Sequence, residues 1–150
     1  MNENFIATHK VIVCSPDAAA ATTDLDGAVI DMAQDNGYDG IALIAHLGDV
    51  TATAAPNLRL MGSAAADGSS PSLENETVAL AAAGASNYDD KIIILDTRGP
   101  VNRYVFSRLL RTTANVAVNS VIAILYKPRK FPVVQGADVL RAVYDWGISS

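Results

Sequence analysis

The sequence predicts a mostly β protein, an antiparallel β-sandwich or jelly roll that forms a single domain over residues 1–150. Short apolar segments recur at intervals of roughly 8–15 residues, and turn-forming residues separate them, which is the pattern of an all-β chain. Long amphipathic helices, which would connect the strands of an α/β fold, are not found. With 150 residues, half of them apolar, the chain can bury one core but is short for two.

The N-terminal half contains several strand candidates, because apolar or β-branched runs are bounded there by Gly, Pro, Asn or Asp. They are Thr8–Cys14, Ala28–Met32, Ile41–Leu47 and Leu58–Met61, with Thr77–Leu80 as a shorter one. Three alanine clusters have no helical apolar stripe, so we expect loops or sheet-edge segments there. These clusters are Ala18–Ala21, Ala64–Ala66 and Ala81–Ala83. Gly62–Pro71, rich in Gly, Ser and Ala, is expected to be an exposed loop.

The C-terminal half is more clearly patterned. Lys91–Asp96 places four apolar residues between charged ends, which predicts a central strand covered on both faces. Asn115–Tyr126 is a strand candidate in which alternation puts five large side chains on one face. Those five are Val116, Val118, Ile122, Ile124 and Tyr126. Arg103–Arg111 fits a strand better than a helix, although a helical stripe also runs through it.

The two ends of the chain are candidates for segments that order on docking. Residues 1–8 form a candidate N-terminal arm. Residues 135–150 form a candidate docking segment, in which Val139, Leu140, Val143 and Trp146 fall at helical spacing. A short terminal helix and an extended tail both fit this pattern.

Several classes of protein are disfavoured by composition. The longest apolar runs, Ile41–Leu47 and Ile92–Leu95, are far shorter than the ~20 residues that cross a bilayer, so we expect no membrane partner. The first residues lack the basic start and apolar run of a secretory signal. Cys14 is the only cysteine, which excludes an internal disulfide, and its apolar neighbours favour a buried thiol over a nucleophile.

Charge is unevenly distributed along the chain. Residues 1–97 hold 14 acidic and 3 basic residues, a net charge of -11, whereas residues 98–150 hold 2 acidic and 8 basic residues, a net charge of +6. This asymmetry indicates a polarised surface unless strands of the two halves pair and neutralise one another. The overall isoelectric point of about 4.8 argues against direct binding of nucleic acid.

No catalytic, cofactor or metal site is predicted. Ile92–Gly99 ends a strand in Asp-Thr-Arg-Gly, as a nucleotide hydrolase can, but the phosphate-binding G-x-x-x-x-G-K-[ST] loop that such a site needs is absent. A Gly-x-Ser-x-Gly elbow is also absent. An alternative hypothesis is a small-ligand- or metal-binding β-sandwich with carboxylate ligands, although their spacing does not match a calcium loop. These carboxylates are Asp24, Asp26, Asp35 and Asp39.

An interaction surface is the better-supported kind of site. Arginine outnumbers lysine in the basic C-terminal part, and arginine suits bidentate contacts with carboxylates. Aromatic residues such as Tyr104 and Phe106 are interspersed among these cations. The predicted interaction residues are Arg103, Arg108, Arg111, Lys127, Arg129, Lys130 and Trp146.

A series of segments between about residues 28 and 134 resembles small virion structural proteins of tailed bacteriophages, of the type that decorates or cements the head. The segments that carry the resemblance are Tyr38-Asp39-Gly40-Ile41-Ala42, Leu58-Arg59-Leu60-Met61-Gly62-Ser63 with Asp67-Gly68-Ser69, Lys91-Ile92-Ile93-Ile94-Leu95-Asp96, Arg103-Tyr104-Val105, Thr113-Ala114-Asn115, and Val121 through Val133. They are strand-and-turn patterns and include no catalytic signature.

This resemblance implies a non-enzymatic β-rich protein, made in the host cytoplasm, that binds the capsid surface of the virion and stabilises the head. Its expected partner is the major capsid protein, and a homo-oligomer, with a trimer favoured, is expected. A head–tail connector, a tail terminator or a tail-tube subunit is the alternative within the same class of particle.

Overall fold

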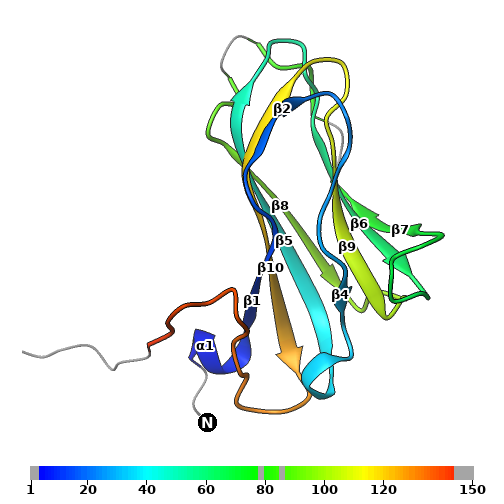
Figure 1. The fold of residues 1–150 in the computed structure, drawn as a ribbon, viewed down its shortest axis with the longest axis vertical. Helices are drawn as coiled ribbons and strands as arrows, with labels where there is room; N and C mark the ends of the chain where they lie inside the picture. The colour runs from blue at the N-terminus through cyan, green and yellow to red at the C-terminus, as the bar shows by residue number, and fades with distance from the viewer. Residues whose placement is uncertain (1–3, 78–79, 85–86, 144–150) are drawn as a thin grey trace, which may run out of the picture.

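The computed structural model describes residues 4–77, 80–84 and 87–143, which form two antiparallel β-sheets packed face to face (Figure 1). The predicted antiparallel β-sandwich is therefore confirmed. Sheet A has the strand order β1-β10-β5-β8, and β2 also pairs with β10. Its strands are β1 (Lys10–Ser15), β2 (Ala18–Ala21), β5 (Tyr38–Val50), β8 (Ile92–Arg98) and β10 (Val116–Pro128).

Sheet B has the order β3-β9-β6-β7, and β4 also pairs with β9. Its strands are β3 (Leu25–Asp26), β4 (Ile30–Asp31), β6 (Asn57–Ser63), β7 (Ser72–Glu76) and β9 (Tyr104–Leu110). Two short helical segments complete the described elements, α1 (Phe5–Thr8) and the 3-10 turn η1 (Gln34–Asn36). Neither is long and apolar enough to cross a membrane.

The core lies between the two sheets and is built from alternate residues of the central strands. β5 contributes Ile41, Leu43 and Leu47, and β9 contributes Val105 and Leu109 from the opposite sheet, all fully buried. Burial of such side chains is worth roughly 1.5–3 kcal/mol each, so this layer supplies much of the driving force for folding.

The two halves of the chain interleave in both sheets. β10 lies between β1 and β5, and β9 lies between β3 and β6. Three ion pairs join acidic residues of the N-terminal half to arginines of the C-terminal half: Asp26–Arg108, Asp31–Arg103 and Asp39–Arg129. Of the two outcomes that the charge split allowed, pairing with partial neutralisation is the one observed.

Strand β10 corrects the face assignment made from the sequence. Val116 and Val118 are buried, but Ile122 and Ile124 lie on the opposite face, outside the sandwich, while Val121 and Leu125 take the inward positions. The register against β5 shifts between Val118 and Ser120, and such a bulge exchanges the inward and outward faces of the residues that follow it. Simple alternation could not anticipate this exchange.

Strand β8 is an edge strand of sheet A, and the predicted central position was wrong. It pairs only with β5 among the described strands. Leu95 faces the core, but Ile92 and Ile94 are 58% and 62% exposed. An apolar run that is covered on both faces in a parallel sheet is covered on one face only at the edge of this antiparallel sheet.

The two ends of the chain differ from the predicted N-terminal arm and the predicted C-terminal helix. Phe5–Thr8 forms a four-residue helix, so this part of the predicted N-terminal arm is structured. No helix is present in residues 135–143. Residues 1–3 and 144–150, including Trp146, lie outside the described residues. The predicted strand Thr77–Leu80 also extends into undescribed residues, and the strand observed before it is β7.

Candidate interaction surfaces

Four of the predicted cations gather at one end of the sandwich, the lower end in Figure 1, where β10 finishes and the loops before β5 and β9 meet. We call this group, Arg103, Lys127, Arg129 and Lys130, the basic end. Arg103 and Arg129 are 26 positions apart in the chain, and both line a pocket of about 360 Å³ together with Tyr38, Asp39 and Asn102. All four cations are exposed.

Backbone hydrogen bonds hold the segments of the basic end together. Gly99 N donates to Asp39 O at 2.7 Å, Arg129 N donates to Gly37 O at 3.0 Å, and Met32 N donates to Arg103 O at 2.8 Å. The cations therefore project from loops that are held together by backbone hydrogen bonds.

The same end contains several residues with left-handed backbone. Asp35, Asn36 and Lys127 have φ values of 53°, 73° and 50°. Gly37, at φ 108°, lies under the Arg129 side chain, where an added Cβ would approach Arg129 Cδ to 3.2 Å. Non-glycine residues in this conformation store strain and occur preferentially at binding and active sites.

Two cations of the basic end are paired with carboxylates. Arg103 makes a bidentate contact with Asp31, at 2.8 and 2.9 Å, and Arg129 contacts Asp39 Oδ1 at 3.0 Å. The hydrogen bonds from Arg103 hold the pKa of Asp31 below its usual range and raise the pKa of Arg103 itself. Among the described residues, neither Lys127 nor Lys130 makes an ion pair, so the positive charge of these two side chains is uncompensated.

Arg108 lies apart from the basic end, on the outer face of sheet B. It makes a bidentate contact with Asp26, at 2.7 and 2.9 Å, and its guanidinium lies 5.6 Å from the centre of the Phe106 ring. A second shallow pocket, of about 250 Å³, includes Arg108, Phe106 and Asp67. The sequence placed Arg108 with Arg103 because the two are close in the chain, but Arg103 precedes β9, and four residues separate it from Arg108, which lies within that strand.

Arg111 is not a surface contact, and its prediction as an interaction residue was wrong. Only 5% of the residue is exposed. Its guanidinium donates to Thr23 O, Ala19 O and Val116 O at 2.8, 2.9 and 3.2 Å. These three carbonyls belong to separate segments at the end of the sandwich opposite the basic end. A buried arginine with satisfied donors therefore ties these segments together.

The outer face of sheet A is an apolar surface that the sequence prediction missed. Directly paired residues of neighbouring antiparallel strands have side chains on the same face. One such row crosses all four strands, and we call its members, Val13, Ile122, Ile44 and Ile94, the apolar row. Ile124 and Ile92 extend it on either side. Val13, Ile92 and Ile94 are more than a third exposed.

The C-terminal segment runs beside β1, at the edge of sheet A where the apolar row begins (Figure 1). The Gln135 side chain accepts from Val11 N at 3.1 Å and donates to Ile6 O and His9 O. Asp138 Oδ2 accepts from Val13 N at 2.9 Å. Side chains of this segment therefore satisfy backbone groups at the outer edge of β1. These contacts protect the edge from pairing with a further strand.

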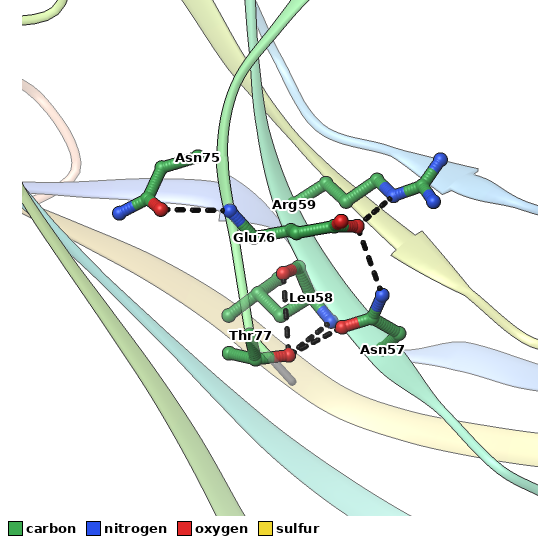
Figure 2. Close-up of polar contacts among 6 residues, drawn as sticks. All are labelled: Asn57, Leu58, Arg59, Asn75, Glu76 and Thr77. Atoms are coloured by element: carbon green, nitrogen blue, oxygen red, sulfur yellow. Dashed lines mark hydrogen bonds and ion pairs between the residues drawn. The ribbon is translucent and has the colours of Figure 1, made fainter. Parts of the chain in front are cut away.

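A polar cluster joins the start of β6 to the end of β7 (Figure 2). Glu76 accepts hydrogen bonds from Arg59 Nε at 2.8 Å and from Asn57 Nδ2 at 3.3 Å. Thr77 Oγ1 accepts from Leu58 N at 3.1 Å and donates to Asn57 Oδ1. Each side chain is engaged within the cluster, so it is a structural clamp between two strands.

The carboxylates of the metal-binding hypothesis are dispersed by the fold. Asp26 pairs with Arg108, Asp35 with Lys10 at 2.7 Å, and Asp39 with Arg129. In residues 4–77, 80–84 and 87–143, no three His, Cys, Asp or Glu side chains lie close enough to hold a metal ion. Cys14 is buried, and desolvation raises the pKa of its thiol to about 12.

Comparison with known proteins gives no family. No family model matches the sequence, and no curated protein matches it. The fold is similar to a chain in the solved structure described as "Bacillus endospore appendages form a novel family of disulfide-linked pili", with a TM-score of 0.45 and 16% sequence identity. The matched region covers 84% of this chain and 96% of that chain.

Proposed function

We propose that this chain is a non-enzymatic structural protein of a tailed-bacteriophage virion, a head decoration protein that binds the capsid surface through its basic end. The proposal rests on the sequence resemblance together with one structural observation. That observation is the gathering of Arg103, Lys127, Arg129 and Lys130 at one end of the sandwich, on hydrogen-bonded loops with left-handed residues, where Arg103 and Arg129 line one pocket.

The chemistry of the basic end suits an acidic protein surface. Arginine fork geometry matches carboxylates, and the paired Asp31 and Asp39 hold Arg103 and Arg129 in fixed orientations. Lys127 and Lys130 add charge that speeds encounter with an acidic patch. A decoration protein of this kind stabilises a head by burying area across neighbouring capsid subunits only after the lattice has formed.

Binding to undecorated capsids tests this function. Wild-type protein should co-sediment with them saturably, at a stoichiometry set by the lattice sites, and binding should weaken as salt rises. The double variant Arg129→Glu with Lys130→Glu should bind more weakly and lose most of the salt dependence. Lys91→Glu, at the other end of the sandwich, is the matched charge-reversal control and should bind as wild type.

Two results would decide against the proposal. Absence of binding to the cognate capsid at micromolar concentration would exclude a decoration role, and equal binding by the double variant would exclude the basic end as the docking surface. A stable hexameric or larger ring in solution would favour the connector, tail-terminator or tail-tube alternative.

A further inference from the structure

We propose that the outer face of sheet A binds the C-terminal segment of a second copy of this chain, so that copies associate by exchanging arms. We define the arm by its described residues, 139–143. The proposal concerns contacts between copies and does not depend on binding to a capsid.

The receiving surface is the apolar row. Val13, Ile122, Ile44 and Ile94 are brought into line by direct pairing across four strands. Large apolar side chains exposed together in one patch mark a contact surface, whereas single exposed ones are ordinary. Ile94 and Ile92, at 62% and 58% exposed, sit at the β8 end of this surface.

The lower part of the same face is already covered. The Tyr126 ring lies over Gly40 on this face, and the His9 ring lies 6.3 Å from it, centre to centre. α1 therefore packs beside Tyr126, and the remaining apolar surface is a band that runs across the strands. A band of this shape fits a single extended segment better than a second flat sheet.

The arm has a length and a chemistry that match the apolar row, and it leaves its own copy at the edge of sheet A. Asp138 binds the backbone of Val13, which is the first member of the apolar row. The next residues include Leu140 and Val143, which are fully exposed and 69% exposed. Five extended residues reach up to about 17 Å, slightly more than the ~14 Å across three strand spacings.

The occupant is another copy because the arm leaves its own sheet. Leu140 is fully exposed although it lies two residues beyond an anchor on β1. An arm folded onto its own apolar row would bury this side chain. Each copy thus offers one arm and one receiving surface, and such a heterologous contact closes into a ring when its rotation permits.

Mass measurement in solution tests the arm and the receiving surface separately. Wild-type protein should give a multiple of the 15.7 kDa chain mass in light scattering coupled to size-exclusion chromatography. The arm variant Leu140→Asp with Val143→Asp, and the surface variant Ile94→Asp, should each give the mass of one chain. Leu73→Asp is the matched control, because Leu73 is 49% exposed on β7, an edge strand of the other sheet, and its mass should match wild type.

A mixing experiment distinguishes exchange between copies from folding back within one copy. The arm variant keeps an intact receiving surface, and the surface variant keeps an intact arm. Mixed together, they should form a complex of one chain of each, detectable by a tag on one of them. Failure of the mixture to associate, a monomeric wild type at every concentration, or wild-type masses for both variants would each overturn the proposal. Cooperative thermal unfolding of each variant excludes misfolding, and Ile94→Ser replaces Ile94→Asp if the latter fails to fold.

Discussion

The Tyr126 ring occupies the space where a side chain at residue 40 would lie, directly above the backbone of Gly40. The two residues are paired across β10 and β5, and Tyr126 Oη donates to Asp96 Oδ1 at 2.5 Å. The ring thus bridges three strands of sheet A on its outer face. Desolvation and this hydrogen bond raise the pKa of Tyr126 to about 12.

Substitution of Gly40 should therefore destabilise the protein. In Gly40→Ala the new methyl group collides with the Tyr126 ring, and such overpacking costs about 1–3 kcal/mol. Urea unfolding measures the change. Gly136→Ala is the control, because a Cβ there would only make ordinary contact with Lys10 Cε at 3.7 Å. Equal stability of the two variants would show that the ring moves aside without loss.

Arg111 should matter for stability, since it is buried and bonded to three carbonyl oxygens. In Arg111→Lys a single ammonium group cannot reach all three segments, so buried carbonyls lose their donor. The expected loss in unfolding free energy is about 2–3 kcal/mol. Arg103→Lys, on the exposed basic end, should change unfolding much less. Comparable losses for the two variants would argue against a structural role specific to Arg111.

The sequence was sufficient to predict the sandwich, because alternation, β-branched residues and turn chemistry act locally. The sequence was insufficient to predict which residues form the outer face of sheet A. The bulge near Asn119 reverses the faces of β10 after Val118, and only then do Ile122 and Ile124 join Ile44 on the outside. A bulge depends on pairing with a distant strand, so its effect is not visible in one segment.

The candidate site could be predicted only in part, because the sequence shows which basic residues are close in the chain but not which of them become buried. Clustering of basic residues along the chain grouped Arg103, Arg129 and Lys130, and the fold keeps them together because β9 begins and β10 ends at the same end of the sandwich. Arg111, at the other end of β9, has the same charge but faces three carbonyl groups that the sequence does not bring together. Burial of a charged group is decided by tertiary partners and not by residue type.

Glu74 should make stability depend on acidic pH. Burial works against its charged form, but hydrogen bonds from Val101 N and from the backbone and side chain of Asn102 outweigh this and lower its pKa. A carboxyl with a lowered folded-state pKa stabilises the fold above its unfolded pKa of about 4.3. That contribution is lost as the pH falls through the lower folded-state pKa.

The matching variant is Glu74→Gln, which does not titrate. Between neutral pH and about pH 3, the unfolding free energy of wild type should fall more steeply than that of the variant. Urea unfolding at a series of pH values measures both slopes. Parallel slopes would assign the acid sensitivity to other carboxyls, of which Asp31 and Asp35 also have lowered pKa values.

The clamp between β6 and β7 should depend on the Thr77 hydroxyl (Figure 2). Thr77→Val keeps the shape of the side chain but removes the acceptor of Leu58 N and the donor to Asn57. We expect a loss of about 1–2 kcal/mol in unfolding free energy. Thr77→Ser retains the hydroxyl and should lose less. The reverse order would show that the methyl group, and not the hydrogen bonds, is what stabilises this position.

Cys14 should be unreactive in the folded protein. Cys14 is 4% exposed, so a reagent cannot reach its sulfur easily. Desolvation also raises the pKa of its thiol to about 12, so little of the reactive thiolate forms at neutral pH. Maleimide should label it slowly in native buffer and rapidly in urea. Leu140→Cys adds a second thiol on the arm, and this one should react quickly in dilute protein. If arms are exchanged between copies, its labelling should slow as protein concentration rises, while Cys14 labelling remains slow throughout. Fast labelling of Cys14 in native buffer would mean that the sandwich opens at β1 far more readily than its packing indicates.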